Sequence, residues 1–292
     1  MSDDPPSGGR TGRLLSDGFA LRYRLEGEGE GEDPPLLVVG SAIYHPRTFS
    51  QALRRRRRLA FIDHRGFAGI ERPLAAQDAA LERVVGDIER MRLHLGLARV
   101  DILGHSGNGY LALEYARRFP AHVGHVVAVA TSPDFSPAHL AAQERRWQET
   151  VAPERKRIDA EQMAALARDL AAQPDQGFIA LCIRMRARSW FDPRYDPAPL
   201  WRGVRVNMPV IDRLWGETFR DLDMHALLRE VRAPILLALG RCDYLSAPAS
   251  AWDAYRADAH RLTVRHFERS AHSPQMEEPA LFDQALLEHL QG

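Results

Sequence analysis

Short apolar runs alternate along the chain with segments of helical periodicity. The apolar runs predict β-strands at residues 19–26, 36–39, 59–63, 100–103, 126–130, 235–239 and 262–267. Apolar residues spaced by three and four predict helices at residues 78–97, 107–119 and 279–290. Because buried strands that alternate with helices form sheets covered on both faces, the pattern predicts an α/β fold with a mostly parallel sheet.

The alternation stops in the middle of the chain, between residues 134 and 231. This segment is charged, helical in pattern, interrupted by prolines, and holds four of the five tryptophans: Trp147, Trp190, Trp201 and Trp215. We expect it to be an inserted helical cap, with residues 14–133 and 232–292 forming the α/β core. Residues 1–13 are rich in Pro, Gly and Asp and hold no apolar run, which predicts a disordered tail.

Composition narrows the classes of partner. The 292 residues are 45% hydrophobic, enough for a large core, and their formal net charge is zero. Neutrality argues against a nucleic-acid partner, and no apolar run is long enough to cross a bilayer, so no membrane partner is expected. The arginine run at residues 54–58 is interpreted as a solvated helix end. Two cysteines without a ligand motif indicate a cytoplasmic protein. The expected assembly is a monomer or a homodimer.

Candidate chemistry centres on the stretch "LGHSGNGY" at residues 103–110. Ser106 falls on a tight turn between a predicted strand and a predicted helix, where a hydroxyl can be presented as a nucleophile. A serine needs a histidine base, and the histidine needs an orienting carboxylate. His272 follows the last predicted strand, and Asp243 follows the strand before it, so both are expected at the sheet edge that holds Ser106. Asp134 is an alternative acid.

These stretches together resemble the α/β-hydrolase superfamily, in its proline iminopeptidase-like branch. The resemblance rests on "GHSGNGYLALEYARRFP", "GRCDYLSAP", "SAHSPQMEEP" and "FIDHRGFAG", and it covers about residues 18–290. It implies an α/β-hydrolase fold with Ser106, Asp243 and His272 as the catalytic triad, in that chain order. The elbow pattern has a small residue at position 108. This chain departs from it with Asn108, which Gly109 follows.

The expected oxyanion hole departs further from the family. Where the family has His-Gly after the third strand, this chain has "VVGSAIYH". The hole would use the backbone N–H of Gly107 and one from Ser41 or Ala42, and the sequence does not choose between the last two. Substrate-binding residues are expected to include aromatic residues of the loop and cap and one acid: Tyr44, Trp190, Trp215 and Glu217.

The expected function is therefore that of a serine hydrolase. It would cleave an ester, lactone or amide of a small, largely apolar molecule through an acyl-enzyme, and a proline iminopeptidase-like activity falls within this class. No metal or organic cofactor is expected, since His122 and His125 have ligand-like spacing without a third ligand. Two alternatives remain: hydrolysis of a C–C bond by the same triad, and a ligand-binding protein with this fold and little turnover.

Overall fold

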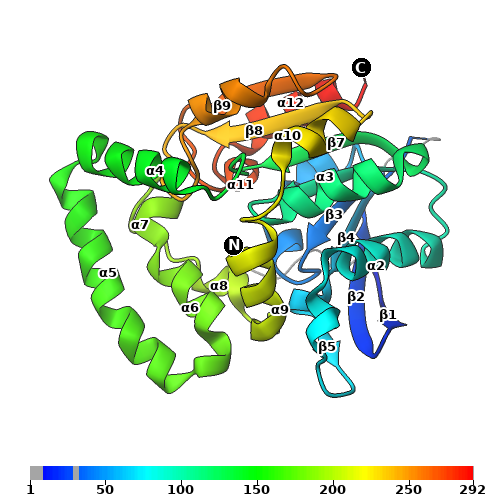
Figure 1. Ribbon diagram of the computed structural model, residues 1–292, viewed down its shortest axis with the longest axis horizontal. Coiled ribbons are helices and arrows are strands. Elements are labelled where there is room, and N and C mark those ends of the chain that lie inside the picture. The colour runs from blue at the N-terminus through cyan, green and yellow to red at the C-terminus, as the bar shows by residue number, and fades with distance from the viewer. Residues whose placement is uncertain (1–8, 29–32, 292) are drawn as a thin grey trace.

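A mixed β-sheet forms the centre of the molecule in the computed structural model, which describes residues 9–28 and 33–291 (Figure 1). The described residues form nine strands. The strands are β1 (Arg10–Ser16), β2 (Phe19–Glu26), β3 (Leu36–Gly40), β4 (Leu59–Asp63), β5 (Gly69–Ile70), β6 (Val100–His105), β7 (Val123–Val129), β8 (Ile235–Gly240) and β9 (Leu262–Phe267).

The order across the sheet is β1-β2-β4-β3-β6-β7-β8-β9, with β5 paired to β2. From β4 to β9 every neighbouring pair is parallel, whereas β1, β2 and β5 are antiparallel to their partners. The expected α/β fold is confirmed. One boundary differs: residues 10–13, expected in the disordered tail, form the first half of β1, and residues 1–8 lie outside the described part of the chain.

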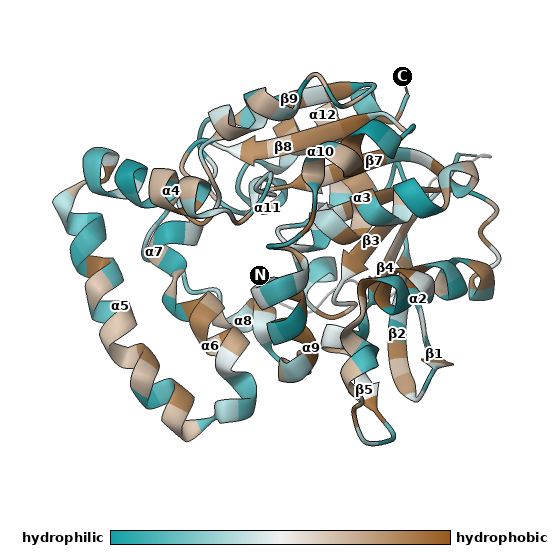
Figure 2. Cartoon of the chain, in the orientation of Figure 1, coloured by the Kyte–Doolittle hydropathy of each residue, from teal (hydrophilic) through white to brown (hydrophobic). Residues whose placement is uncertain are grey.

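Two helical layers cover the sheet because side chains on each strand alternate between its faces. On β3, Leu37 and Val39 join a cluster under α2, α3 and α10, while Leu36 and Val38 join a cluster under α1 and α12. Figure 2 shows the strands as mainly hydrophobic. The covering helices are α1 (Gln51–Arg54), α2 (Leu81–His94), α3 (Asn108–Arg118), α10 (Met224–Glu230), α11 (Pro274–Glu277) and α12 (Pro279–His289).

Further helices project from one side of the sheet between β7 and α10 (Figure 1). They are α4 (Pro137–Thr150), α5 (Pro153–Ala172), α6 (Gly177–Arg184), α7 (Arg186–Ser189), α8 (Ala198–Trp201) and α9 (Met208–Arg213). They carry two apolar clusters of their own, one around Trp190 and one around Trp147. We call residues 134–219 the cap from here on. α10, which was expected in the cap, packs against α3 in the core layer.

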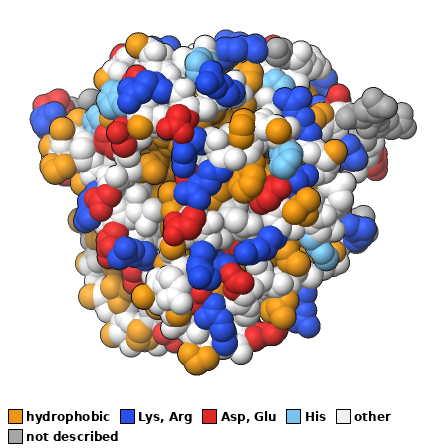
Figure 3. Space-filling view, turned by 45° about the vertical axis from the view of Figure 1, so that its right-hand side comes forward, with side chains coloured by type: hydrophobic (Ala, Val, Ile, Leu, Met, Phe, Trp, Pro, Cys, Tyr) orange, Lys and Arg blue, Asp and Glu red, His pale blue; other side chains and the backbone are white. Residues whose placement is uncertain are grey.

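The arginine run at residues 54–58 is only partly solvated. Arg54 and Arg57 are buried: Arg54 pairs with Glu26 at 2.7 Å, and Arg57 pairs with Asp101 at 2.6 Å. The other three arginines of the run are exposed, as the helix-end interpretation expected. On the face shown in Figure 3, cationic and anionic side chains are intermixed. Among the described residues, no helix is both long and apolar enough to span a bilayer.

Candidate active site

The parallel strands bring the sequence motifs to one edge of the sheet. Ser41 follows β3 and Ser106 follows β6, and these two strands are direct neighbours in parallel register. Asp243 follows β8, and His272 follows β9, so all four residues lie beyond the carboxyl ends of their strands. In parallel sheets that edge is where ligands bind, at the point where the strand order reverses.

Ser106 occupies a strained turn. Its φ angle is +58°, a left-handed conformation that non-glycine residues seldom adopt, and its N–H donates to the carbonyl oxygen of Val129 at 2.7 Å. The next residue, Gly107, lies directly under the Trp215 ring: a Cβ there would come within 2.6 Å of it. The turn therefore requires glycine at this position, and it holds the Ser106 side chain at the entrance of α3.

His272 and Asp243 are in direct contact. Nδ1 of His272 lies 2.8 Å from Oδ2 of Asp243, and the other carboxylate oxygen accepts the N–H groups of Leu245 at 2.8 Å and Ser246 at 3.2 Å. Burial acts to raise the pKa of Asp243, but His272 and these hydrogen bonds hold the pKa below its usual range. The carboxylate is thus ionised, and it fixes the imidazole with the proton on Nδ1.

The alternative acid, Asp134, is engaged elsewhere. Its carboxylate contacts Nδ1 of His139 at 2.6 Å and accepts the hydroxyl of Tyr255 at 2.5 Å. Burial acts against ionisation of Asp134, but the hydrogen bonds from Tyr255 and Ser136 outweigh it and lower the pKa to about 2. Asp134 therefore has its own partners, whereas His272 pairs with Asp243.

Backbone contacts hold His272 in place from two sides. The N–H of His272 donates to the Ser189 carbonyl of the cap at 3.0 Å, and its carbonyl oxygen lies 2.6 Å from Nε2 of His105. The half-buried carboxylate of Glu277 accepts the flanking N–H groups of Ala271 at 2.8 Å and Ser273 at 3.3 Å. Its other oxygen accepts the N–H of Phe191, in the cap, at 2.6 Å. The loop of His272 is thereby tied to the cap.

Glu277 was not singled out from the sequence, and His105 was interpreted there as a packed residue rather than a catalytic one. His105 sits in the elbow motif next to Ser106, and Glu277 lies five residues beyond His272 in "SAHSPQMEEP", so proximity in sequence was the available signal. Their roles depend on which backbone groups they reach. Burial, followed by the neighbouring His272, lowers the pKa of His105 to about 3, so its ring is neutral at physiological pH and donates from Nε2.

The loop after β3 distinguishes the two candidate oxyanion donors. The N–H of Ala42 donates to Oδ1 of Asp63 at 2.8 Å and is therefore already used. Within the described part of the chain, the N–H groups of Ser41 and Gly107 have no hydrogen-bond partner. The hydroxyl of Ser41 accepts the N–H groups of Ile43 at 3.3 Å and Tyr44 at 3.2 Å, which closes the loop on itself.

Asp63 and Arg65, from the "FIDHRGF" segment, both form ion pairs. The Asp63 carboxylate, besides holding Ala42, pairs with Arg22 at 2.5 Å. Arg65 is fully buried and pairs with Asp87 at 2.5 Å and also with Asp17 and Asp78. Both residues thus anchor the segment after β4, and neither lines the candidate pocket.

Ser106 and His272 line a pocket of about 250 Å³ between the sheet edge and the cap. Most of its wall is apolar, as is usual for ligand pockets. The aromatic residues of the wall are Tyr44, Phe67, Phe135, Phe178, Trp190, Trp201 and Trp215. Three predicted substrate-binding residues, Tyr44, Trp190 and Trp215, and the predicted oxyanion residue Ser41 are therefore in the wall. Glu217 is not: it pairs with Arg213 and half of its side chain is exposed.

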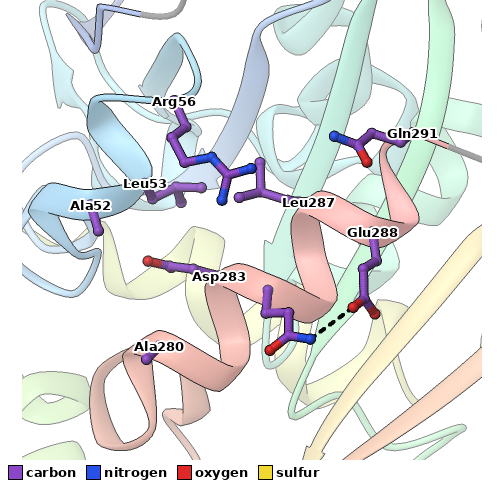
Figure 4. A pocket seen from close by; sticks show the side chains of 9 residues that line it. Ala52, Leu53, Arg56, Ala280, Asp283, Leu287, Glu288 and Gln291 are labelled. Carbon is purple, nitrogen blue, oxygen red and sulfur yellow. Dashed lines mark hydrogen bonds between the residues drawn. The ribbon is translucent and has the colours of Figure 1, made fainter.

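A second hollow of about 390 Å³ lies on the other helical layer, between α1 and α12 (Figure 4). Arg56, Asp283 and Leu287 point toward it from the two helices. Oδ2 of Asp283 accepts the hydroxyl of Ser50 at 2.5 Å. No residue of the Ser106, Asp243 and His272 group lines it. Ser106 and His272 line the pocket beneath the cap instead.

Comparison with known proteins agrees with this arrangement. A protein of the AB hydrolase superfamily from Bacillus subtilis, YclE, is 45% identical over 276 residues, covering 94% of this chain and 97% of the relative. A proline iminopeptidase from Heyndrickxia coagulans is 26% identical, covering 85% of this chain and 88% of the relative. The crystal structure of proline iminopeptidase from Mycobacterium smegmatis superposes with a TM-score of 0.72 at 18% identity, covering 97% and 98% of the two chains.

The family model of the α/β-hydrolase fold matches residues 36–279. That match begins at β3, the first parallel strand, and ends at the start of α12, so it spans all the parallel strands, the cap and every residue of the candidate site, and leaves out β1 and β2. Since the matched region is most of the chain, and the parallel sheet carries its polar loops at the carboxyl edge, this protein belongs to the α/β-hydrolase family.

Proposed function

We propose that this protein is a serine hydrolase in which Ser106, His272 and Asp243 form the catalytic triad. The observation that carries the proposal is the 2.8 Å contact between His272 and the ionised Asp243, at the pocket that also exposes Ser106. A histidine oriented in this way presents its second ring nitrogen as a base, which is what an unactivated serine hydroxyl requires.

The proposed reaction runs in two halves. Ser106 Oγ attacks the acyl carbonyl while Nε2 of His272 accepts the hydroxyl proton, and the tetrahedral intermediate collapses as His272 returns that proton to the leaving group. Water then attacks the acyl-enzyme with the same histidine as base, which releases the acid and regenerates Ser106. Asp243 stabilises the imidazolium that forms in each half.

The oxyanion would bind to the N–H groups of Gly107 and Ser41. Both groups are free of other partners within the described residues, whereas Ala42 already donates to Asp63. Two fixed backbone donors aimed at a developing negative charge contribute about 3 kcal/mol each in related sites. This supports Ser41 over Ala42 as the second donor.

The substrate class that this pocket supports is a small, largely apolar ester, lactone or amide. The wall is dominated by aromatic side chains, and its volume of about 250 Å³ suits a compact acyl group. Relatives named proline iminopeptidases support an amide bond as one member of the class. Tyr44, Trp190 and Trp215 would contact the acyl group.

Labelling with a fluorophosphonate probe tests the proposal. One covalent adduct that maps to Ser106 by peptide mass spectrometry, and that is absent in Ser106→Ala, is the expected result. Folded protein without an adduct would reject the nucleophile assignment and would favour a binding protein with little turnover. Melting temperature of both proteins, measured in parallel, serves as the folding control.

A further inference from the structure

The candidate pocket contains no charged side chain. Among the described residues that line it, there is no Asp, Glu, Lys or Arg. Its polar groups include the hydroxyls of Ser41, Ser189 and Ser273 and the amide of Asn108. Burial lowers the pKa of the His45 and His105 rings in the wall, which keeps both rings neutral. This contrasts with the outer surface, where Figure 3 shows both kinds of charged residue over the whole visible face.

Three carboxylates close in sequence to the pocket wall already have other partners. Both carboxylate oxygens of Glu277 accept backbone N–H groups, including that of Phe191 at 2.6 Å. Asp134 is held by His139 and Tyr255. Glu217, the one acid expected to bind substrate, pairs with Arg213 at the surface. None of these carboxylates is available to a substrate in the pocket.

Two side chains in the wall also indicate surroundings that disfavour charge. Cys182 lies in its wall, and burial raises the pKa of this thiol to about 12. Burial likewise raises the pKa of the Tyr44 hydroxyl. Both shifts report surroundings that disfavour charge. A charged substrate group placed there without a counter-charge would lose several kcal/mol of hydration, and no side chain compensates for it.

We propose that this pocket selects acyl groups that carry no charge, and discriminates against both a free amine and a free carboxylate next to the scissile bond. The inference rests on the proposed serine hydrolase function and defines its substrate class. A prolyl group with a free ring nitrogen is a cation at neutral pH, so the chain would differ in specificity from relatives named proline iminopeptidases. Its substrates are neutral alicyclic, aromatic or short aliphatic esters and amides.

Three methyl esters of matched shape test the selection. Methyl cyclopentanecarboxylate is neutral, methyl L-prolinate replaces one ring carbon by a charged nitrogen, and the monomethyl ester of cyclopentane-1,3-dicarboxylic acid adds a carboxylate. We expect kcat/KM for the neutral ester to exceed that for each charged ester by at least about tenfold, after division by the rate with hydroxide. That division removes the intrinsic activation of the prolinate carbonyl.

The pH dependence of the preference between the esters gives an internal control. Near pH 6.5 the prolinate nitrogen is protonated, whereas above its pKa of about 8 it is neutral. The preference for the neutral ester should therefore shrink as the pH rises through that range. An equal or higher normalised kcat/KM for methyl prolinate at pH 6.5 would overturn the inference, and so would an equal rate for the dicarboxylic monoester.

A pair of variants at Cys182 tests whether a charge in the wall shifts the selection toward the charged ester. Cys182→Asp places a carboxylate in the wall, and Cys182→Asn places a neutral group of the same shape at the same position. We expect Cys182→Asp to raise the prolinate-to-cyclopentane ratio at least about tenfold over Cys182→Asn. The ratio is internal to each variant, so a loss of folded protein does not affect it. Equal ratios in the two variants would contradict a pocket whose specificity is set by charge.

The proposed function and this inference fail in different ways. If the fluorophosphonate labels Ser106 but none of the esters is hydrolysed, two ketones replace the esters. Cyclopentyl methyl ketone is the neutral compound and 2-acetylpyrrolidine the charged one, and each is tested for protection of Ser106 from labelling. The inference expects the neutral ketone to protect more strongly. Stronger protection by the charged ketone rejects the substrate class and leaves the serine hydrolase intact. If Ser106 is not labelled at all, the hydrolase proposal fails, and the substrate class fails with it.

Discussion

Nε2 of His105 lies 2.6 Å from the carbonyl oxygen of His272, so the residue before the proposed nucleophile holds the backbone of the proposed base. Because the carbonyl can only accept, the His105 ring donates from Nε2. The low pKa of His105, about 3, keeps the ring in this neutral form throughout the range in which hydrolases are assayed.

We expect His105→Phe to lower kcat about 10- to 100-fold with a smaller change in KM, because the base is misplaced rather than removed. His105→Gln should recover much of the loss, since its side-chain amide can donate from a similar position. Steady-state kinetics on one aryl ester, with the fluorophosphonate labelling rate beside it, would check both variants. Equal losses in Phe and Gln variants would mean that the ring matters for packing alone.

The contact between His272 and Asp243 predicts which acid is essential. Asp243→Asn should reduce kcat by roughly 10²- to 10⁴-fold, because an amide no longer selects the imidazole tautomer with the proton on Nδ1. Asp134→Asn should leave kcat close to that of the unchanged protein, since Asp134 bonds to His139 and Tyr255. The opposite order of the two losses would transfer the acid role to Asp134.

The hydrogen bond between Asp63 and Ala42 leads to a prediction for the loop after β3, which would supply an oxyanion donor. Oδ1 of Asp63 holds the N–H of Ala42, and the adjoining Ser41 N–H is the proposed donor to the oxyanion. Asp63→Ala removes the acceptor, and we expect kcat to fall about tenfold or more as the donor shifts. Asp63→Asn retains one acceptor oxygen and should lose less.

The measurement for this pair is kcat on an ester, with the free energy of unfolding measured in urea. Asp63 also pairs with Arg22, so both variants are expected to lose stability. A loss of kcat that is the same in Asp63→Asn and Asp63→Ala would show that the charge, and not the hydrogen bond to Ala42, determines the rate.

Buried neutral histidines predict loss of stability in mild acid. Burial, partly offset by Asn108, lowers the pKa of His64 from 6.5 to about 3. In this range the unfolded imidazole binds a proton that the folded one does not, so the free energy of unfolding decreases as the pH falls from about 6.5 toward 3. The slope for one such histidine is at most about 1.4 kcal/mol per pH unit. His105 acts in the same direction.

His64→Asn isolates one of these contributions. Nδ1 of His64 accepts the N–H of Gly66 at 3.0 Å, and the side-chain oxygen of asparagine can take that role without titrating. Urea unfolding between pH 6 and 5 should have a slope that is shallower by about 1 kcal/mol per pH unit in the variant. Asp63, whose pKa burial raises to about 6, also titrates in this window, but it does so in both proteins and cancels from the difference between their slopes. An unchanged slope would mean that His64 is protonated in the folded protein.

Much of the site follows from local sequence. A strand, a tight turn and a helix place Ser106, and the loops after the last two parallel strands place Asp243 and His272 at the same edge. Those positions follow from sheet geometry, which needs only the order of strands and helices. The family match is therefore in agreement with the expectation from three short motifs.

Contacts between residues far apart in the sequence could not be predicted in the same way. That Ala42 is occupied depends on Asp63, which follows a different strand, and the burial of Arg57 depends on Asp101 across the sheet. Glu217 was expected to bind substrate because the resemblance to iminopeptidases implies acidic cap residues that hold a free amino group. A helical neighbour, Arg213, instead pairs with it outside the pocket. Pairings of this kind are set by tertiary packing, which periodicity does not describe.

The ties between the cap and the loop of His272 have a mechanical consequence. The Ser189 carbonyl and the Phe191 N–H, both in the cap, bond to the His272 N–H and to Glu277 respectively. A displacement of residues 189–191 away from the sheet would therefore also displace His272, the proposed base. The same few hydrogen bonds would then link the opening of the pocket to the position of the base, so that a cap lifted from the sheet would leave Ser106 without its proton acceptor.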